Sequence, residues 1–412
     1  MKRRAVVVIL AAVTCWALAG CGDDLEAIVP TVNEVFPLEA GGTSEEPEDA
    51  VEQNNTKEQN NTKEQDSTKE QTSADRQGGT EGIDGTAASK EGSAESEPEE
   101  IHITISAAGD VTLGNYFGQE YTWSFREMWE KQQNPAYFLE NVYDIFSSDD
   151  MTIVNLEGPL TNAEERKEEQ TYCISGDPEF ADILTEGSVE AVSMANNHRL
   201  DYYEQGTADT VEAVSSRGIS YAYDKNLGLY ETKGICIGFV SVNEVGQGAG
   251  VETIFKEGIA LLREQGADLV LANCHWGIER ENYPEEYQLS LGKKCIDWGA
   301  DLVLGHHPHV LQGIEEYQGK YIVYSLGNFC FGANRNPKDK DCIIFQQTFT
   351  FRDGILQDDT EARIIPCSVS SVSNRNDYRP TPAEGEDAQR IIERMNEYSA
   401  DFGVHIDENG DL

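Results

Sequence analysis

The chain has 412 residues and carries 75 acidic side chains against 31 basic ones, a formal net charge of −44. Residues 1–21 contribute +3 to this charge, residues 22–100 contribute −17, and residues 101–412 contribute −30. This charge disfavours nucleic acid as a partner, and a polyanion could approach only through a metal ion or a local basic group.

The N-terminus is typical of a secreted lipoprotein. Basic residues at 2–4 precede an apolar run from Ala5 to Leu18, which is short for a membrane span. The run ends at Cys21 in the sequence LAGC, which is similar to the processing site of bacterial lipoproteins. The alternative is an ordinary cleaved signal with an incidental cysteine. We expect residues 1–20 to be a signal peptide, and a lipid on Cys21 to anchor the protein to the extracytoplasmic face of the bacterial cell membrane.

Residues 21–100 are too polar to build a core. They are poor in aromatic and β-branched side chains and contain a six-residue repeat, EQNNTK, which starts at residues 52, 58 and 64 with small variations. The repeat has no apolar position, so nothing in it can be buried. We expect a disordered acidic linker that tethers the folded part.

Residues 101–370 are predicted to form one α/β domain, followed by a helical extension at 371–412. Short apolar runs alternate with helical patterns, which favours a mainly parallel sheet. After residue 309 the predicted strands follow one another closely, which indicates an antiparallel section and a pair of mixed sheets. The expected strands are 101–106, 151–155, 189–193, 235–242, 268–274, 301–304, 310–317, 321–325, 343–352 and 362–369, and the expected helices 135–147, 178–186, 203–217, 251–266, 284–299 and 384–399.

Seven cysteines lie in the predicted folded region. Their number is odd and none form a CxxC pair, which argues against a disulfide scaffold and against a structural zinc site. Several lie in apolar runs and are most simply small buried side chains. One or two disulfides remain open at this stage.

Polar side chains of metal-binding type follow five of the predicted strands, at the point where each strand ends. In a parallel sheet the carboxyl ends of the strands share one edge, so these side chains should converge. Each alone has a simpler interpretation, such as a turn residue, a helix cap or a solvated charge. The set consists of Asp110, Glu157, Asn197 with His198 and Asp201, His275, and His307 with His309.

The densest part of this set is the sequence GHHPH at residues 305–309. In an extended segment His307 and His309 would point to the same side, and Pro308 between them would stiffen the backbone. Neutral imidazoles on one rigid edge suit a divalent transition metal. A polar loop with fortuitous histidines is the alternative. Trp276, next to His275, is expected to form a wall of the pocket.

Taken together and in this order, these motifs resemble the bacterial CapA-type proteins of capsule and poly-γ-glutamate biosynthesis. Their domain is similar to the calcineurin-like metallophosphoesterases, so the resemblance implies a metallophosphoesterase-like α/β fold, a four-layer αββα sandwich. It covers residues 101 to 370, and neither the linker nor the last helix. The matching segments are GD at 109–110, NLE at 155–157, ANNH at 195–198, HWG at 275–277, HPHV at 307–310 with Gln312, and YSLGNF at 324–329.

The resemblance implies a role for each matching residue. Two metal ions would be bound, with Glu157 between them and with Asn155 and Asn328 lining the pocket. His198 would protonate a leaving group and Asp201 would orient it. The first ion would be held by Asp110 and His309, and the second by Asn197, His275 and His307.

Two departures from the phosphoesterase pattern concern the first ion. Thr112 stands where a second histidine would be, and Glu157 replaces the usual aspartate. One or two divalent ions, Mn²⁺ or Zn²⁺, are therefore expected.

Three functions stay open from the sequence. The first is a lipid-anchored component of capsule or poly-γ-glutamate synthesis and export, with the anionic capsule polymer, the membrane and membrane synthase or export subunits as partners. The second is an independent metal-dependent phosphoesterase or γ-glutamyl hydrolase. The third is a non-catalytic polymer-binding protein whose metal site has decayed.

Overall fold

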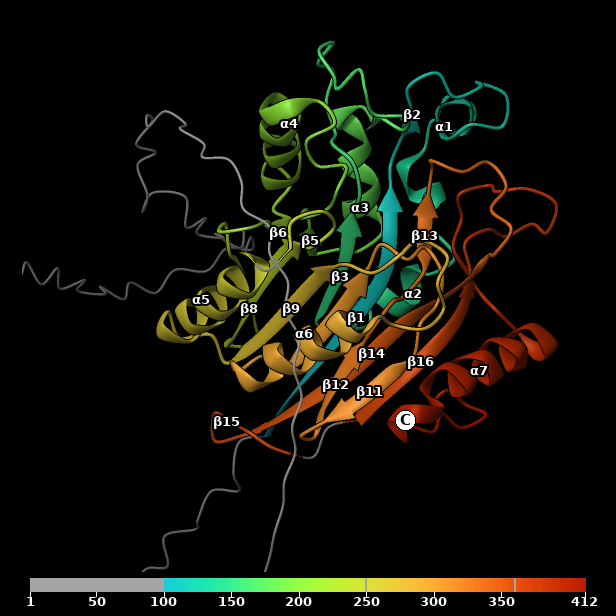
Figure 1. Ribbon diagram of the computed structural model, residues 1–412. Coiled ribbons are helices and arrows are strands. Elements are labelled where there is room, and N and C mark those ends of the chain that lie inside the picture. Colours follow the sequence, from blue (N-terminus) through green and yellow to red (C-terminus); the bar gives the residue numbers. More distant parts are fainter. Residues whose placement is uncertain (1–99, 249, 359–360) are drawn as a thin grey trace, which may run out of the picture. The chain divides into compact units, whose positions relative to one another are not determined.

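The computed structural model describes residues 100–248, 250–358 and 361–412 (Figure 1). The expected signal peptide, Cys21 and the linker up to residue 99 lie outside the described residues. Among the described residues, no helix combines the length and the apolarity needed to cross a membrane. The seven cysteines of this part are all free thiols.

The larger sheet has nine strands and is built around β1 (Glu100–Thr112). β1 is parallel to β3 (Met151–Leu156) on one side and antiparallel to β14 (Asp341–Arg352) on the other. In addition, the carboxyl end of β1 pairs with β13 (Asn328–Phe331) in parallel. The remaining strands are β5 (Ala191–Ser193), β6 (Ser220–Ala222), β15 (Ile355–Leu356), β16 (Glu361–Ser368) and β17 (Thr381–Pro382).

The second sheet has six strands in the order β11-β12-β10-β9-β8-β7. Its inner four strands are parallel, and the outer pairs β7–β8 and β11–β12 are antiparallel. The bounds are β7 (Gly228–Thr232), β8 (Ile235–Asn243), β9 (Leu269–His275), β10 (Leu302–His306), β11 (Ile314–Tyr317) and β12 (Lys320–Val323). A separate small pair consists of β2 (Asn115–Tyr116) and β4 (Ile174–Ser175).

Side-chain caps mark the start of several helices. Ser124 accepts a hydrogen bond from the backbone of Glu127 at the start of α1 (Phe125–Gln132), and Glu285 and Gln288 form a capping box on α6 (Glu286–Asp297). The other helices are η1 (Pro135–Phe138), α2 (Tyr143–Phe146), η2 (Pro178–Ala181), α3 (Asp182–Glu186), α4 (Tyr203–Ser215), α5 (Gly250–Glu264), α7 (Gly385–Ser399) and η3 (Ala400–Phe402).

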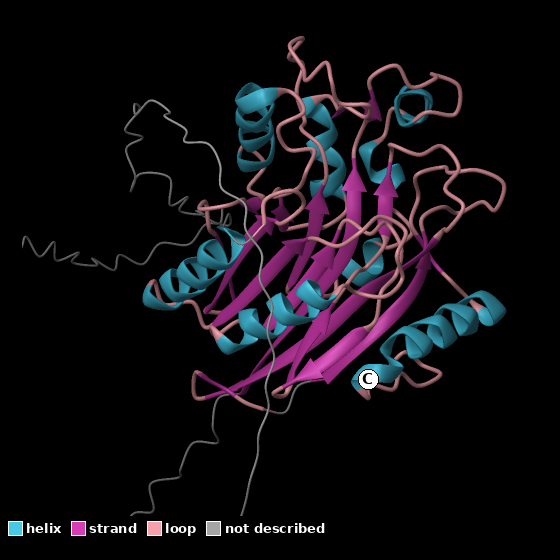
Figure 2. Cartoon of the chain, viewed as in Figure 1, coloured by secondary structure: helices cyan, strands magenta, loops and turns pink. Residues whose placement is uncertain are grey.

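Figure 2 shows the helices beside the strands of the sheets. Three hydrophobic cores hold these elements together. Between the two sheets, Ile105 and Ile153 of the larger sheet pack in one core with Leu271 and Leu304 of the second. On the outer face of the larger sheet lie α1 to α4, and on the outer face of the second lie α5 and α6. Helix α7 packs against β16 and β11 and adds its apolar side to the core between the sheets. Alternate residues of each strand therefore face different cores.

Most of the expected elements are present, but their assignment to sheets differs from the expectation. The five strand ends were expected on one parallel sheet, and this was wrong: β1, β3 and β5 belong to the larger sheet, whereas β9 and β10 belong to the second. The strand expected at 310–317 is reduced to β11, and the helix at 135–147 to η1 and α2. β13 and α1 were not expected at all. β13 has only four residues, and the helical spacing of Phe125, Met128 and Trp129 in α1 was overlooked.

Candidate metal site

Asp110 lies at the carboxyl end of β1 and is fully buried. A close approach of two chain segments places it there: its backbone N–H donates to the carbonyl of Gly327 at 3.0 Å. A Cβ on the preceding residue, Gly109, would lie 1.9 Å from that same carbonyl oxygen, so only glycine fits. The carboxylate of Asp110 accepts a hydrogen bond from Asn155 Nδ2 at 2.8 Å.

Glu157 follows β3 and is likewise buried, but its carboxylate has no hydrogen-bond partner among the described residues. Its backbone N–H donates to Val111 on the neighbouring strand at 2.8 Å, which turns the side chain inward. Glu157 Oε1 lies 3.8 Å from Nε2 of His309, 3.9 Å from Nε2 of His275 and 4.0 Å from Nε2 of His198. Three imidazoles thus surround one carboxylate oxygen at distances too long for hydrogen bonds.

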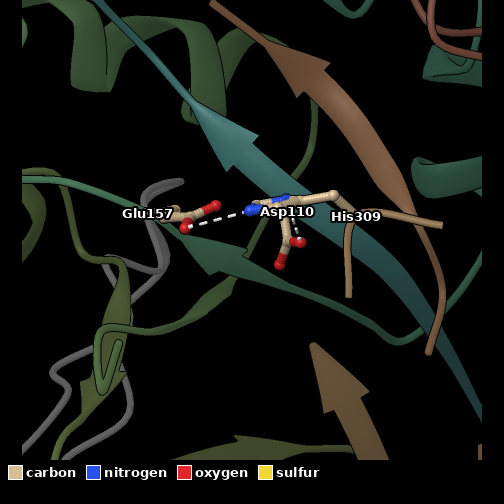
Figure 3. A group of neighbouring side chains, drawn as sticks. All are labelled: Asp110, Glu157 and His309. Carbon is tan, nitrogen blue, oxygen red and sulfur yellow. Dashed lines mark ion pairs between the residues drawn. The ribbon is translucent and has the colours of Figure 1, made fainter. Parts of the chain in front are cut away.

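His309 connects the two carboxylates (Figure 3). Its Nδ1 lies 3.0 Å from Asp110 Oδ2 and 3.0 Å from Asn328 Oδ1, while its Nε2 faces Glu157. Ligand atoms of Asp110, Glu157 and His309 all lie within 4.8 Å of one another. Because β13 pairs with β1 here, Asn328 stands opposite Asp110 and also donates to the backbone carbonyl of His309 at 3.1 Å.

The second sheet supplies His275 at the end of β9, and three contacts place its ring. Its Nδ1 lies 3.3 Å from Asn155 Nδ2, and its Nε2 lies 2.9 Å from Asn197 Oδ1. The ring of His307 is centred 4.8 Å away. The structure therefore brings Asn197, His275 and His307 together as one group, beside the group of Asp110, Glu157 and His309.

The backbone at residues 307–309 differs from the expected extended strand. His307 has φ +96° and His309 has φ +58°, both in the left-handed region that is costly for side chains with a Cβ. Their rings are tilted by 56° at 5.7 Å rather than aligned on one side. The expected extended geometry is wrong, and the bend instead points the two rings toward different groups of partners.

His198 and Asp201 form a pair beside Glu157. His198 Nδ1 lies 2.8 Å from Asp201 Oδ2, and that oxygen also accepts the backbone N–H of Ile174 at 2.7 Å. The side chain of Gln170 approaches His198 Nδ1 at 3.2 Å. The pair is nearly buried, so Asp201 holds the imidazole with Nε2 turned toward Glu157.

One predicted pocket residue lies elsewhere. The Trp276 ring packs in the core between the second sheet and its helices, stacks on Tyr324 at 5.9 Å and donates to the Tyr324 carbonyl at 2.9 Å. Successive residues of a strand point to opposite faces, so the neighbour of an inward His275 has to point outward.

Three residues of the site were not predicted from the sequence: His306, Asn196 and Gln170. His306 pairs in register with His275, is buried, and lies 3.6 Å from Asp110 Oδ1 through its Nδ1. Asn196 Nδ2 donates to the Leu156 carbonyl at 2.9 Å and so braces the turn that carries Glu157. The position of His306 within the GHHPH cluster was a usable signal. Nothing in the sequence marked Gln170.

Burial and mutual attraction shift the pKa values of these groups in opposite directions. Burial alone would keep Asp110 protonated, but its hydrogen bond to His309 and the nearby imidazoles hold its pKa below the usual range. Burial raises the pKa of Glu157, and the attraction of His309 does not offset it. Burial lowers the pKa of His306 and of His307 to about 4, so both rings are neutral at pH 7.

These residues fit a divalent metal ion. Glu157 Oε1 and Oε2, His306 Nδ1 and His307 Nδ1 are buried polar atoms without any hydrogen-bond partner among the described residues. Such atoms cost roughly 1–3 kcal/mol each unless a ligand satisfies them. Donors bound at about 2.1 Å to a tetrahedral Zn²⁺ lie about 3.4 Å from one another. The separations of 3.8 to 4.0 Å around Glu157 Oε1 exceed this by about half an ångström. Carboxylate and neutral imidazole donors are the mixed set that Mn²⁺ and Zn²⁺ accept.

Comparison with known proteins identifies the family. Residues 104–333, which include every site residue described above, match the family described as Bacterial capsule synthesis protein PGA_cap. The chain belongs to this family. The match begins in β1 and ends just after β13, the two strands that position Asp110 and Asn328.

Two relatives and one solved structure show how far the similarity extends. The PGA biosynthesis protein CapA of Bacillus subtilis is 30% identical over 250 residues, 56% of this chain and 63% of that protein. The capsule biosynthesis protein CapA of Bacillus anthracis is 26% identical over 273 residues, 60% of this chain and 64% of that protein. The chain thus matches just under two thirds of the length of each. A crystal structure of a hypothetical protein from Thermus thermophilus aligns with a TM-score of 0.39 and 18% identity, over 64% of this chain and 99% of that one.

Proposed function

We propose that this protein is an accessory protein of capsule or poly-γ-glutamate synthesis whose domain carries a hydrolase-type divalent-metal site. Membership of the capsule-synthesis family and the names of the two Bacillus relatives support the biological role. The observation that carries the chemical part is the convergence of Asp110, Glu157 and His309 from two sheets around buried, unpartnered donor atoms.

The fold we propose is the four-layer αββα sandwich of the metallophosphoesterases. Two face-to-face sheets with helices on both outer faces support this assignment. In such a fold the carboxyl ends of strands from both sheets surround one site. This would explain why Glu157 of one sheet and His275 of the other come within 3.9 Å.

A divalent ion bound here would polarise a phosphoester or amide oxygen and make a water molecule nucleophilic near neutral pH. Asp110 and His309 would hold one ion, and Glu157 would lie between that ion and a second one. Where a second ion binds, Asn197, His275 and His307 would hold it. His306, 3.6 Å from Asp110, lies where it could supply the nitrogen donor that Thr112 lacks.

His198 and Asp201 would handle the leaving group. Asp201 accepts the Nδ1 proton of His198, which fixes the tautomer and turns Nε2 toward the site. A protonated His198 could then donate its Nε2 proton to a departing oxygen or nitrogen. Burial opposes protonation of His198, but its hydrogen bond to Asp201 and the charge of Glu157 raise its pKa above the usual range.

The location and partners belong to the same proposal. A lipid on Cys21 would hold the domain at the extracytoplasmic face of the membrane, where the anionic capsule polymer emerges from membrane synthase or export subunits. Mass spectrometry of the mature protein tests the anchor: we expect a diacylglyceryl adduct on Cys21 that Cys21→Ala abolishes. A mature N-terminus at any other residue would refute the anchor.

The metal site is tested with the purified protein. We expect Mn²⁺ or Zn²⁺ to bind at micromolar concentrations and to support hydrolysis of a nitrophenyl phosphodiester or of γ-glutamyl oligomers, and Asp110→Asn to lose both properties. If the wild type turns over neither substrate in excess metal, the hydrolase part is wrong.

The cellular role is tested separately. Deletion of the gene should reduce the surface polymer, and the His307→Ala variant should fail to restore it. Full restoration by His307→Ala would instead favour a non-catalytic polymer-binding protein. Hydrolysis with an unchanged polymer level after deletion would favour an independent hydrolase.

A further inference from the structure

We propose that an exposed shelf beside the metal site binds an extended polycarboxylate peptide chain, so that the polymer is held while one unit enters the site. This inference rests on the function proposed above and names its substrate class. The Trp123 shelf, as we define it, consists of Trp123, Lys131, Arg335 and Arg375.

Trp123 has an unusually exposed side chain and an unusual backbone conformation for an aromatic residue of its size. Its side chain is 45% exposed, and its backbone has φ +63°, in the left-handed region. Two backbone hydrogen bonds hold the residue in this conformation. The backbone N–H of Trp123 donates to Glu127 Oε2 at 2.5 Å, and its backbone carbonyl accepts from the Tyr378 hydroxyl at 2.6 Å. A strained and tightly held backbone that keeps an indole in solvent suggests that the ring has a ligand.

Cations lie over this ring. The guanidinium of Arg375 is 4.5 Å from the centre of the indole, and the ammonium of Lys131 is 5.2 Å from it. Arg335 donates to the carbonyl of the preceding residue, Thr122, at 2.8 Å. A polycarboxylate peptide chain offers a matching partner for each part of this surface. Its amide planes and methylene groups could pack on the indole ring, and its carboxylates could pair with the guanidinium and ammonium groups.

The charges around the shelf leave cations available. Lys131 pairs with Glu127 at 3.0 Å and Arg335 with Glu120 at 2.7 Å. Arg375 forms no ion pair with any described carboxylate, and the same holds for the exposed Arg126 on α1, three positions from Trp123. Since residues 101–412 carry a net charge of −30, an anionic chain would be attracted to these unpaired cations and repelled elsewhere.

The shelf is connected to the metal site through two loops. The loop that carries Trp123 continues β1 beyond Asp110, and Figure 1 shows α1 and β2 at the end of the molecule toward which β1 and β13 point. The loop that carries Arg335 follows β13, whose Phe331 has its ring 5.1 Å from that of His309. Asn376, next to Arg375, donates to the carbonyl of Phe331 at 2.9 Å. A polymer on the shelf would therefore lie beside the residues that hold the metal.

The test measures binding of poly-γ-glutamate to the purified protein with EDTA present, at 20 and 200 mM NaCl. We expect Trp123→Ala and Arg375→Ala each to weaken binding about five- to tenfold, and the higher salt concentration to weaken wild-type binding. Trp123→Phe and Arg375→Lys should retain part of the affinity, which guards against simple misfolding. Hydrolysis of a small nitrophenyl ester should be unchanged in all four variants, because the shelf does not contact the metal donors.

Matched controls come from other surfaces. Tyr143 is also 45% exposed but lies on α2, which precedes the amino end of β3, and Lys256 is an exposed cation on α5. Tyr143→Ala and Lys256→Ala should bind the polymer like the wild type.

The outcomes separate the shelf from the function on which it rests. If the wild type binds the polymer and the Trp123 and Arg375 variants bind it equally well, the shelf is wrong and the proposed function stands. If the wild type does not bind poly-γ-glutamate, the shelf is wrong, whereas the proposed function is refuted only by the metal, hydrolysis and gene-deletion tests given above. Tighter binding of an acidic polysaccharide than of poly-γ-glutamate would overturn the assignment to a polycarboxylate peptide.

Discussion

At the residue scale, the site contains buried charges and polar atoms without hydrogen-bond partners, and these lower the stability of the metal-free fold. Glu157 is buried with neither carboxylate oxygen hydrogen-bonded to a described residue, and burial raises its pKa. A bound cation would offset the free-energy penalty of burying this carboxylate, so a functional requirement explains why such a destabilising residue is present.

Glu157→Gln should therefore have opposite effects on metal binding and on the metal-free protein. The amide keeps the shape but loses the negative charge, so we expect metal affinity to fall at least about tenfold. The melting temperature of the metal-free variant should equal or exceed that of the wild type. Calorimetric titration and thermal unfolding in EDTA measure the two effects. A clear loss of metal-free stability would show that Glu157 is mainly structural.

The pair of His198 and Asp201 makes a second prediction, about the leaving group. Asp201→Asn removes the acceptor that orients His198, so hydrolysis should fall by about 10²-fold for esters with poor leaving groups. The loss should be much smaller for nitrophenyl esters, whose leaving group needs no proton, and metal binding should be unchanged. Equal losses on both substrates would indicate that Asp201 supports the local structure, for example through Ile174.

At the element scale, the contact between β1 and β13 decides whether the site exists. The two strands lie so close that the Gly109 Cα faces the carbonyl of Gly327, and this spacing places Asp110 opposite Asn328. β13 has only four residues, so this short strand depends on its fit to β1.

Gly109→Ala tests this contact. The added methyl group would lie 1.9 Å from a backbone oxygen, and moving the strands apart should cost about 2–3 kcal/mol of stability. Metal binding should be lost with it, because Asp110 and Asn328 would separate. Gly250→Ala is the control: it is the first residue of α5, its Cβ would meet nothing within 4 Å, and the stability should change by less than about 0.5 kcal/mol.

The amino end of β3 allows a prediction about pH. Asp149 Oδ2 accepts from the Thr152 hydroxyl at 2.7 Å, and burial raises the pKa of Asp149 to about 7. The unfolded chain releases this proton near pH 4, so the group lowers the stability of the folded protein as the pH rises from about 4 to 7. We expect Asp149→Asn to stabilise the protein by about 1 kcal/mol at pH 8, a value reduced for the partial exposure of the side chain, and to have little effect at pH 4.

Denaturant unfolding at both pH values measures this difference. The exposed Asp144→Asn on α2 is the matched control and is measured at the same two pH values. A gain for Asp149→Asn that is the same at both pH values would contradict the shifted pKa.

At the scale of the whole molecule, the metal donors come from both sheets, so a bound ion would join them. Asp110, Glu157 and Asn197 lie at or just beyond the carboxyl ends of strands of the larger sheet, and His275, His307 and His309 at or just beyond those of the second. The core between the sheets already holds them together, and the ion would add a second connection at their carboxyl edge.

Metal should therefore stabilise the whole described domain. At a concentration 100 times the dissociation constant, a ligand that binds only the folded state adds about 2.7 kcal/mol. We expect Mn²⁺ or Zn²⁺ to raise the melting temperature by a few degrees, in a single transition, and Asp110→Asn to abolish the increase. Two separate transitions, with one sheet unaffected by metal, would contradict a site shared between the sheets.

The residue types of the site and most of its elements were predictable from local patterns. Asp110, Glu157, His275 and the histidines at 307 and 309 could be selected because each follows an apolar run, and strand ends are local features of a sequence. Which sheet each strand joins depends on pairing between residues far apart, such as His102 with Thr350 or Asp110 with Asn328, and no local pattern encodes it. For the same reason Trp276 was assigned to the wrong face and His306 was overlooked. The bend at His307 and His309 is likewise a property of the folded chain, because the packing of two sheets overrides the backbone conformation that a single segment prefers.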